Sequence, residues 1–349
     1  MNEVKIGEHL IGTDHPTLLI AELSGNHNHD FDLAVEMIRA AARAGADAIK
    51  LQTYRPETIT IDCDNDHFRI GEGTVWAGKT LFELYGEAFT PWEWQPKLKE
   101  VANEEGLVLF STPFDPTAVD FLEEMEVPCY KIASFEIVDT PLIRKVAATG
   151  KPMIISTGMA TIEEIDEAVT AARQSGCDQI CLLKCTSAYP ATPEMMNLRA
   201  IPDLSERFGV ITGLSDHTLN LEVPLAAVAL GARIIEKHFT LDRAAGGPDS
   251  TFSLEPDEFR DMVDSVRLVE QALGSVTYGA GRDEDASRIF RRSLFVVEDV
   301  AEGELFTGGN VRSIRPGIGL HPRHLEEILG RRASHSLSRG TPLSWDHVV

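Results

Sequence analysis

Short apolar runs alternate with amphipathic segments over most of the chain, from about residue 18 to residue 272. The apolar runs, rich in β-branched residues, span 17–23, 47–54, 107–114, 129–135, 152–158, 180–189, 210–217 and 233–241. Continuous apolar runs of this length, each followed by a helical pattern, are typical of buried parallel strands. Eight such repeats predict an α/β fold, a closed (β/α)8 TIM barrel with its helices on the outside.

An open, doubly wound sheet is the alternative fold for this pattern. It would normally carry a glycine-rich dinucleotide loop after its first strand, and the sequence contains neither G-x-G-x-x-G nor a P-loop motif. The barrel is therefore favoured. The segment 55–92 is a long excursion between the second strand and its helix, and we expect it to cover an active site.

The pattern changes after Leu273. GSVTYGAGRDEDASR is polar and glycine-rich, as linkers are, and it leads into short strands predicted over 293–300 and 341–349 and one short helix over 321–329. We therefore predict a barrel domain over residues 1–280, a linker over 281–290 and a small β-rich domain over 291–349.

Composition and charge restrict the class of protein, its expected location and the partners it can bind. The chain has 349 residues, of which 43% are hydrophobic and 25% charged, which is typical of globular proteins. It has no apolar stretch long enough to span a membrane and no secretory signal at its start, so a cytoplasmic location is expected. A net charge of −23 argues against nucleic acid or an anionic membrane as partner. The five cysteines suit a reducing compartment, and Cys177, Cys181 and Cys185 are expected to pack in the core.

Polar residues end nearly every apolar run, at the carboxyl mouth where barrel enzymes hold their active sites. They include Glu22, Lys50, Gln52, Thr112, Lys131, Ser134, Ser156, Ser187, Tyr189, Ser215, His217, Glu236 and His238. Successive side chains on a strand point to opposite faces, so Asp216 and Lys237 should point away from the mouth residues, toward the helices.

Three kinds of chemistry are expected at this mouth. His217 and His238 lie at the same level of neighbouring strands, which suits a divalent metal with its other positions left to water or substrate. A lone histidine would more often be structural.

Lys50 and Lys131 supply charge for a phosphate and a carboxylate, with hydrogen bonds from Thr112, Ser134, Ser156 and Ser215. The alternative is that either lysine reaches out to solvent.

Glu22 is a candidate general base near the metal, or else a salt-bridge partner of Lys50. Ser187 and Glu236 are assigned to substrate binding. Arg315 lies between Pro316 and a glycine-rich turn, where it can be presented to a neighbouring site.

Nine motifs occur in a characteristic order: AELSGNHN, KLQTY, STPFD, YKIASFE, ISTGMAT, CTSAYP, GLSDHT, EKHFT and GGPDS. This series resembles the sialic acid synthase family over essentially the whole chain. The segment with NVRSIRPGIGL is similar to the antifreeze-like (SAF) domain of that family. Within the family, ELSGNHN, TPWEW, KIASFE and CTSAYP resemble the pseudaminic acid synthases more closely than the N-acetylneuraminate or legionaminate synthases.

The resemblance implies condensation of phosphoenolpyruvate with an open-chain N-acetylated amino sugar and release of phosphate. For pseudaminate, the sugar is 2,4-diacetamido-2,4,6-trideoxy-altrose. Matched by motif, the implied metal ligands are His217 and His238, holding Mn²⁺, with Mg²⁺ or Co²⁺ as alternatives. The implied phosphoenolpyruvate contacts are Lys50, Thr112, Lys131, Ser134, Ser156 and Ser215. The implied sugar contacts are Gln52, Tyr189 and Asp249, and the implied acid/base is Glu22.

The resemblance also implies a domain-swapped homodimer, in which Arg315 reaches from the SAF domain into the partner subunit's barrel. Sialic acid enzymes carry asparagine where this chain has Ser187, which favours a different sugar. Other functions stay open: N-acetylneuraminate or legionaminate synthesis, another phosphoenolpyruvate–aldose condensation, or a metal-dependent aldolase. A non-catalytic carbohydrate-binding protein is the remote alternative.

Overall fold

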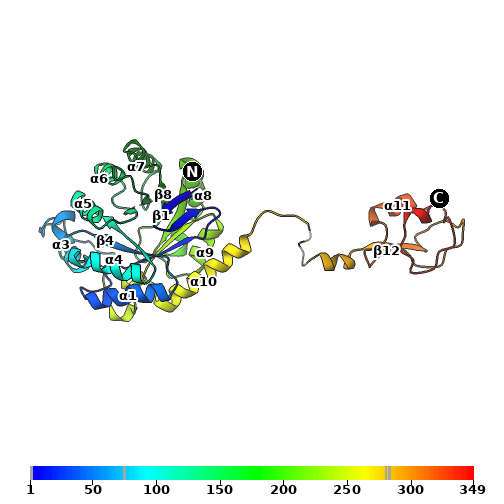
Figure 1. Cartoon of the computed structure of the whole chain (residues 1–349), viewed down its shortest axis with the longest axis horizontal. Helices are drawn as coiled ribbons and strands as arrows, with labels where there is room; N and C mark the ends of the chain where they lie inside the picture. Colours follow the sequence, from blue (N-terminus) through cyan, green and yellow to red (C-terminus); the bar gives the residue numbers. More distant parts are fainter. Residues whose placement is uncertain (1–2, 74–75, 280, 282–283) are drawn as a thin grey trace. The chain divides into compact units, whose positions relative to one another are not determined.

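The computed structural model describes residues 3–73, 76–279, 281 and 284–349. It divides into two compact units, Met1–Gly274 and Ser275–Val349 (Figure 1). Residue 280, at the end of the predicted barrel domain, and residues 282 and 283 of the predicted linker lie outside the described residues. So do residues 74 and 75 of the excursion.

The first unit is a closed barrel of parallel strands, as predicted, and each predicted apolar run contains one of them. In barrel order they are β3 (Leu18–Glu22), β4 (Ala48–Thr53), β5 (Val108–Pro113), β6 (Tyr130–Ile132), β7 (Met153–Ser156), β8 (Ile180–Cys185), β9 (Ile211–Asp216) and β10 (Ile234–His238). The barrel closes because β10 pairs in parallel with both β9 and β3. The TIM-barrel prediction is confirmed.

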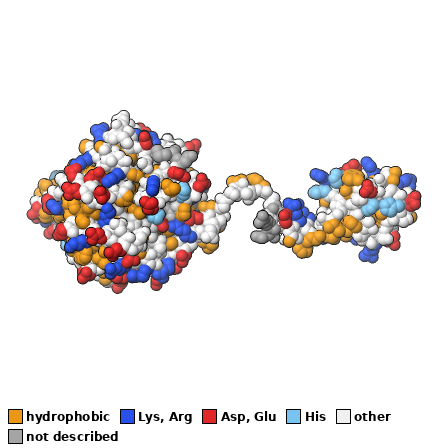
Figure 2. All heavy atoms as spheres, viewed as in Figure 1, with side chains coloured by type: hydrophobic (Ala, Val, Ile, Leu, Met, Phe, Trp, Pro, Cys, Tyr) orange, Lys and Arg blue, Asp and Glu red, His pale blue; other side chains and the backbone are white. Residues whose placement is uncertain are grey.

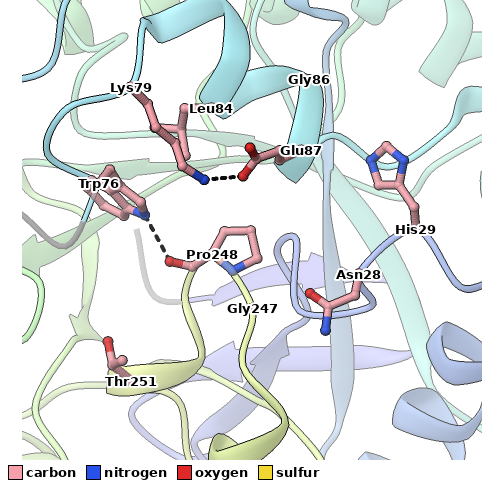
Figure 3. Close-up of a pocket in the computed structure, with 10 residues that line it drawn as sticks. All are labelled: Asn28, His29, Trp76, Lys79, Leu84, Gly86, Glu87, Gly247, Pro248 and Thr251. Atoms are coloured by element: carbon pink, nitrogen blue, oxygen red, sulfur yellow. Dashed lines mark hydrogen bonds and ion pairs between the residues drawn. The ribbon is translucent and has the colours of Figure 1, made fainter.

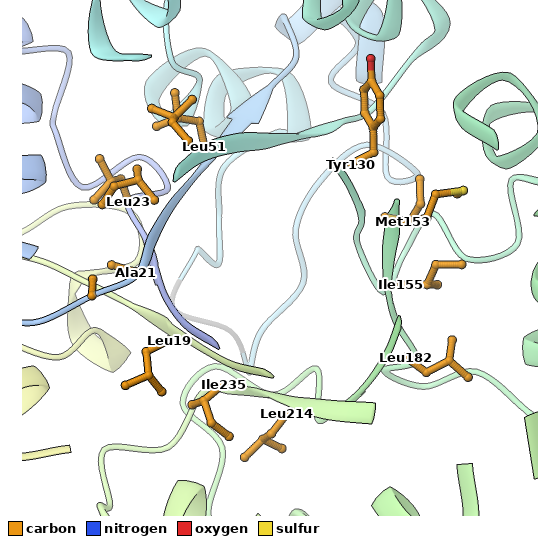
Figure 4. Close-up of a cluster of buried hydrophobic side chains, with 14 of the residues drawn as sticks. Leu19, Ala21, Leu23, Leu51, Tyr130, Met153, Ile155, Leu182, Leu214 and Ile235 are labelled. Atoms are coloured by element: carbon orange, nitrogen blue, oxygen red, sulfur yellow. The ribbon is translucent and has the colours of Figure 1, made fainter. Parts of the chain in front are cut away.

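Helices surround the barrel and bury the outward faces of its strands. They are α1 (Phe31–Arg43), α4 (Gln95–Glu104), α5 (Pro116–Glu124), α6 (Thr140–Ala147), α7 (Ile162–Gln174), α8 (Ala200–Phe208), α9 (Glu222–Ala229) and α10 (Pro256–Leu273). Figure 4 shows outward-pointing strand residues such as Leu19, Leu51 and Ile155, which belong to the core shared with these helices. Local signals set the helix starts: Thr161 accepts a hydrogen bond from the backbone of Glu164 and so caps α7.

An antiparallel hairpin that the sequence pattern did not predict precedes the barrel. Its strands are β1 (Glu3–Ile6) and β2 (His9–Gly12), joined through Gly7, whose φ of 58° suits glycine in a tight turn. Val4, Ile6 and Ile11 pack with the residues that begin the barrel strands, such as Leu18. The hairpin therefore fills the amino-terminal end of the barrel.

The excursion between β4 and α4 contains α2 (Pro56–Ile59) and α3 (Leu81–Ala88). Trp92, at its end, donates a hydrogen bond from Nε1 to the Tyr54 carbonyl oxygen at 3.0 Å. The Trp92 ring stacks on Phe121 of α5, with ring centroids 4.7 Å apart. Trp92 thus holds the excursion against the helix layer.

In the second unit, the described residues form β11 (Ser293–Val296), which pairs antiparallel with β12 (Val311–Ile314), and the short helix α11 (Leu325–Ile328). Leu294, Val296 and Phe306 belong to its own buried core. The strand predicted over 341–349 is wrong. Residues Trp345–His347 form a 3-10 turn capped by Ser344, and pairing there is limited in the described chain to isolated bridges such as Phe295–Pro342.

Acidic and basic side chains are interspersed over the surface in view (Figure 2). Across the residues that the structure describes, no helix has both the length and the apolar character needed to cross a bilayer.

Asp216 and Lys237 point toward the helix layer, as strand alternation predicts. Lys237 Nζ lies 2.9 Å from Asp216 Oδ2 and also donates to the Thr218 carbonyl oxygen. The Asp216 side chain is 0% exposed and that of Lys237 1% exposed. The two buried charges therefore neutralise each other, and either one alone would be unfavourable at this position.

We expect Lys237→Met to lower the free energy of unfolding by about 3–5 kcal/mol, because it leaves a buried carboxylate without its cation. Chemical denaturation followed by circular dichroism measures the change. The matched control is Lys145→Met, which breaks a more exposed pair with Asp120 and should cost less than about 1 kcal/mol. Equal losses in the two variants would contradict the assignment.

Candidate active site

The inner face of the barrel changes from apolar to polar along each strand. On β3, Leu18 and Ile20 are followed by Glu22, and on β10 Ile234 is followed by Glu236 and then His238. The apolar members belong to the inner core, whereas the carboxylates and the imidazole are buried above it, at the carboxyl end. Ionisable groups from several strands are thus held in one layer.

The two lysines are buried inside the barrel. Lys50 is 4% exposed and Lys131 2% exposed, so neither reaches bulk solvent. Lys50 Nζ lies 2.5 Å from Glu22 Oε2 and 3.5 Å from Glu236 Oε1. Lys131 Nζ lies 3.8 Å from the same Glu236 oxygen. The salt bridge between Glu22 and Lys50, one of the two predictions for Glu22, is therefore present.

Burial and charge act differently on the two carboxylates. Burial raises the pKa of Glu22, and the attraction of Lys50 does not offset it. Burial also acts to raise the pKa of Glu236, but Lys131 and Lys50 together outweigh it, so that pKa is lowered. Burial lowers the pKa of Lys131, whereas Glu22 and Glu236 together outweigh burial and raise the pKa of Lys50. A bound anion would stabilise the charged form of both lysines.

Hydroxyl groups surround the lysines at hydrogen-bond distance. Lys131 Nζ donates to Ser156 Oγ at 2.7 Å, and Lys50 Nζ donates to Thr112 Oγ1 at 3.4 Å. Ser215 Oγ donates to a Glu236 oxygen at 3.2 Å. These predicted phosphoenolpyruvate contacts therefore lie around one cluster.

Ser134 and Ser187 face each other across Gly158, whose φ is 35°. A Cβ atom at that position would lie 2.6 Å from Ser134 Oγ and 2.8 Å from Ser187 Oγ. A Cβ atom would lie within 3 Å of both serines, so only glycine lets the backbone pass this close to them.

The two predicted metal ligands lie together, with ring centroids 5.3 Å apart. His217 Nδ1 donates to the Thr186 carbonyl oxygen at 2.9 Å, and the ring also interacts with the Cys185 side chain. Burial acts to lower the pKa of His217, but Cys185 and the bond to Thr186 outweigh it and raise that pKa, so this ring has to give up a proton before it can bind an ion. Burial holds the pKa of His238 well below its usual value, so this ring is neutral, as a ligand must be.

His238 Nδ1 is buried, has no hydrogen-bond partner among the described residues and lies 3.8 Å from Asp249 Oδ2. In the described part of the chain, no group of three or more His, Cys, Asp or Glu side chains is placed to share an ion. The pair of imidazoles therefore fits an ion that takes its other ligands from water and substrate.

Of the predicted sugar contacts, Tyr189 and Asp249 lie beside the histidines, and Gln52 contacts Glu22. The Tyr189 ring lies 4.5 Å from that of His217, and Gln52 Nε2 donates to Glu22 Oε1 at 3.1 Å. Asp249 accepts a hydrogen bond from Ser24 Oγ, and its backbone nitrogen donates to Asn26 Oδ1 at 3.2 Å. These bonds to the β3–α1 loop fix the Asp249 carboxylate beside His238.

Two residues at the site were missed in the sequence. Cys185, expected in the core, interacts with His217 and Ser134, which lower the pKa of its thiol to about 7 against the raising effect of burial. Glu136 has a buried Oε2 without a hydrogen-bond partner among the described residues, and burial raises its pKa to about 7 despite nearby Lys131. Its position in the sequence could have identified Glu136 as a site residue, because it follows Ser134 in YKIASFE, just beyond the end of a strand.

Glu136 predicts a pH-dependent stability. The folded state holds this proton more tightly than the unfolded state, so stability falls as the pH rises from about 4.5 to about 7. We expect Glu136→Gln to remove this loss, making the variant more stable than the parent by about 3 kcal/mol above pH 7 and by almost nothing near pH 4.5. Denaturant titrations across this range measure the difference. A difference that does not change with pH would contradict the prediction.

Comparison with known proteins places the chain among related enzymes. The NeuB family model matches residues 37–278, and the SAF domain model matches residues 291–349. The chain is 45% identical to the pseudaminic acid synthase of Campylobacter jejuni over 95% of its own length and 96% of the relative's. It is also 45% identical to that of Helicobacter pylori, over 95% and 98%.

Among solved structures, an N-acetylneuraminic acid synthetase from Leptospira borgpetersenii matches with a TM-score of 0.73 and 35% identity. The match covers 82% of this chain and 95% of that one. The family model covers most of the barrel, and the curated relatives are similar over nearly the full length. The chain therefore belongs to the NeuB family.

Proposed function

We propose that this chain is a pseudaminic acid synthase. It condenses phosphoenolpyruvate with 2,4-diacetamido-2,4,6-trideoxy-altrose and water, giving pseudaminate and phosphate. The observation that carries the proposal is one buried layer in which Lys50 and Lys131 face Glu22 and Glu236, next to the imidazoles of His217 and His238. Two relatives at 45% identity carry the same activity in their names.

Phosphoenolpyruvate binds in the lysine layer in this proposal. Its phosphate and carboxylate take their charge from Lys50 and Lys131 and their hydrogen bonds from the hydroxyls of Thr112, Ser134, Ser156 and Ser215. Holding both substrates in one orientation beside each other supplies much of the rate.

The sugar aldehyde is placed toward His217 and His238, with Tyr189, Gln52 and Asp249 as its contacts. The third carbon of phosphoenolpyruvate attacks the first carbon of the sugar, water adds to the second carbon of phosphoenolpyruvate, and loss of phosphate leaves a keto acid. Glu22, whose burial raises its pKa, exchanges the proton that these steps require. A divalent ion bound by the two histidines would polarise the aldehyde as a Lewis acid.

We propose Mn²⁺ as that ion, with Mg²⁺ or Co²⁺ as alternatives, since imidazole nitrogens accept several divalent metals. We also place the protein in the cytoplasm. Its cysteines at positions 63, 129, 177, 181 and 185 are free thiols, which suits a reducing compartment.

A phosphate-release assay tests the proposed function. Chelated protein should release no phosphate, and adding Mn²⁺ back should restore release only when phosphoenolpyruvate and the altrose derivative are both present. The assay is repeated with N-acetylmannosamine and with the diacetamido-trideoxy-hexose that leads to legionaminate. If either of these sugars is turned over faster than the altrose derivative, that sugar is the acceptor and the proposed one is wrong.

The same assay separates the other functions. A metal-dependent aldolase would release no phosphate with any sugar. A non-catalytic carbohydrate-binding protein would release none either, and would bind sugar equally well after His217→Ala and His238→Ala. The proposed synthase instead predicts that both substitutions abolish phosphate release.

We further propose a domain-swapped homodimer in which Arg315 completes the partner's site. Arg315 is exposed and directly follows β12, and the Gly317 backbone nitrogen beyond it donates to the Ile289 carbonyl oxygen at 2.9 Å. The arginine is thus displayed from a fixed turn of the second unit.

Mixed dimers test this arrangement. Arg315→Ala and His217→Ala chains should each be inactive, whereas co-refolding them should restore about a quarter of the parent activity. Half of the dimers are then mixed, and one of the two sites in each has both residues. Sedimentation confirms the dimer, and a co-refolded mixture without activity would overturn the swap.

A further inference from the structure

A cavity of about 640 Å³ lies between the excursion and the loop that carries Asp249 (Figure 3). His217 and His238 are not among the residues that line it. Its walls are Asn28, His29, Trp76, Lys79, Leu84, Gly86, Glu87, Gly247, Pro248 and Thr251. Of these, Trp76 is the largest side chain, and it comes from the excursion that was expected to cover the site.

Two contacts fix the position of the Trp76 indole. Its Nε1 donates to the Pro248 carbonyl oxygen at 2.8 Å, as Figure 3 shows, and the next residue is Asp249. Its ring centroid lies 5.5 Å from that of Tyr189, which in turn lies 4.5 Å from His217. The indole is therefore adjacent to Tyr189 and Asp249, two predicted sugar contacts. The Tyr189 ring lies between the indole and His217, one of the two predicted metal ligands.

The charged groups of the cavity are paired with each other. Lys79 Nζ and Glu87 Oε2 form an ion pair at the rim, with the side chains 43% and 55% exposed (Figure 3). They therefore provide no net charge for a ligand. The rest of the lining is mixed: Asn28, His29 and Thr251 are polar, whereas the indole, Leu84 and Pro248 are its apolar surfaces.

We propose that Trp76 is a specificity-determining residue, forming an apolar wall that favours a methyl group over a hydroxymethyl group at the sixth carbon of the sugar. The inference rests on the proposed function. Because the aldehyde carbon must lie at the histidines, the sixth carbon of an open-chain hexose extends away from them, toward this cavity.

The preference follows from the chemistry of the wall. A methyl group gains by leaving water for an aromatic surface, whereas a hydroxyl group that lies against the indole face gives up hydrogen bonds to water there. The indole N–H cannot replace them, because it already donates to the Pro248 carbonyl oxygen. An apolar wall rejects one added hydroxyl by about 10- to 100-fold at most, so that is the expected size of the preference.

The experiment compares kcat/KM for the 6-deoxy acceptor and for the same sugar with a hydroxyl at the sixth carbon. The parent enzyme should prefer the 6-deoxy sugar by about 10- to 100-fold. Trp76→Ala should reduce the ratio to within a few-fold of one, and Trp76→Phe, which keeps an apolar ring, should retain most of it. The KM for phosphoenolpyruvate should change in neither variant.

Trp92→Ala is the matched control, because that indole belongs to the same excursion but stacks on Phe121 and does not line the cavity. It should leave the ratio unchanged. If Trp76→Ala fails to fold, Trp76→Gln serves instead, since its amide can hydrogen-bond the hydroxyl and should also lower the ratio.

The outcomes separate the two proposals. If the parent releases phosphate with neither sugar, the proposed function fails. If the parent is active but Trp76→Ala and Trp76→Gln slow both sugars equally, the indole has only a structural role and the specificity inference is overturned.

Discussion

The ion pair between Lys50 and Glu22 is the interaction on which the interior of the barrel depends. A lysine charge that is shielded from water needs carboxylates beside it, and Lys50 Nζ lies 2.5 Å from Glu22 and 3.5 Å from Glu236. Glu236 compensates Lys131 in the same way. The result is a polar layer that can stay folded while it is empty and can still exchange a carboxylate contact for a bound anion.

The barrel could be predicted because the strands are buried on both faces and are therefore continuous apolar runs. Strand alternation also gave the direction of Asp216 and Lys237 correctly, since this periodicity is local. The hairpin β1–β2 could not be recognised in this way. Each of its strands has four residues, with Glu3 and Lys5 exposed between buried neighbours, which is too short a pattern to distinguish from a loop.

The candidate site was predictable where its residues lie on strands and less so where loops carry them. His217 and His238 were expected to meet because register on neighbouring strands determines their distance. Glu136 and Trp76 lie on loops, and their neighbours depend on tertiary packing that no short sequence pattern encodes. Cys185 is buried, as its apolar surroundings in the sequence predicted. Its position on β8 also places the thiol beside His217, which the sequence pattern did not indicate.

The apolar hairpin at the amino-terminal end has a consequence for access to the barrel interior. Val4, Ile6 and Ile11 pack against inner residues of the barrel such as Leu18 and Phe110, so two apolar layers lie beneath the polar layer. Ligands of the polar layer can therefore enter and leave only through the carboxyl end of the barrel.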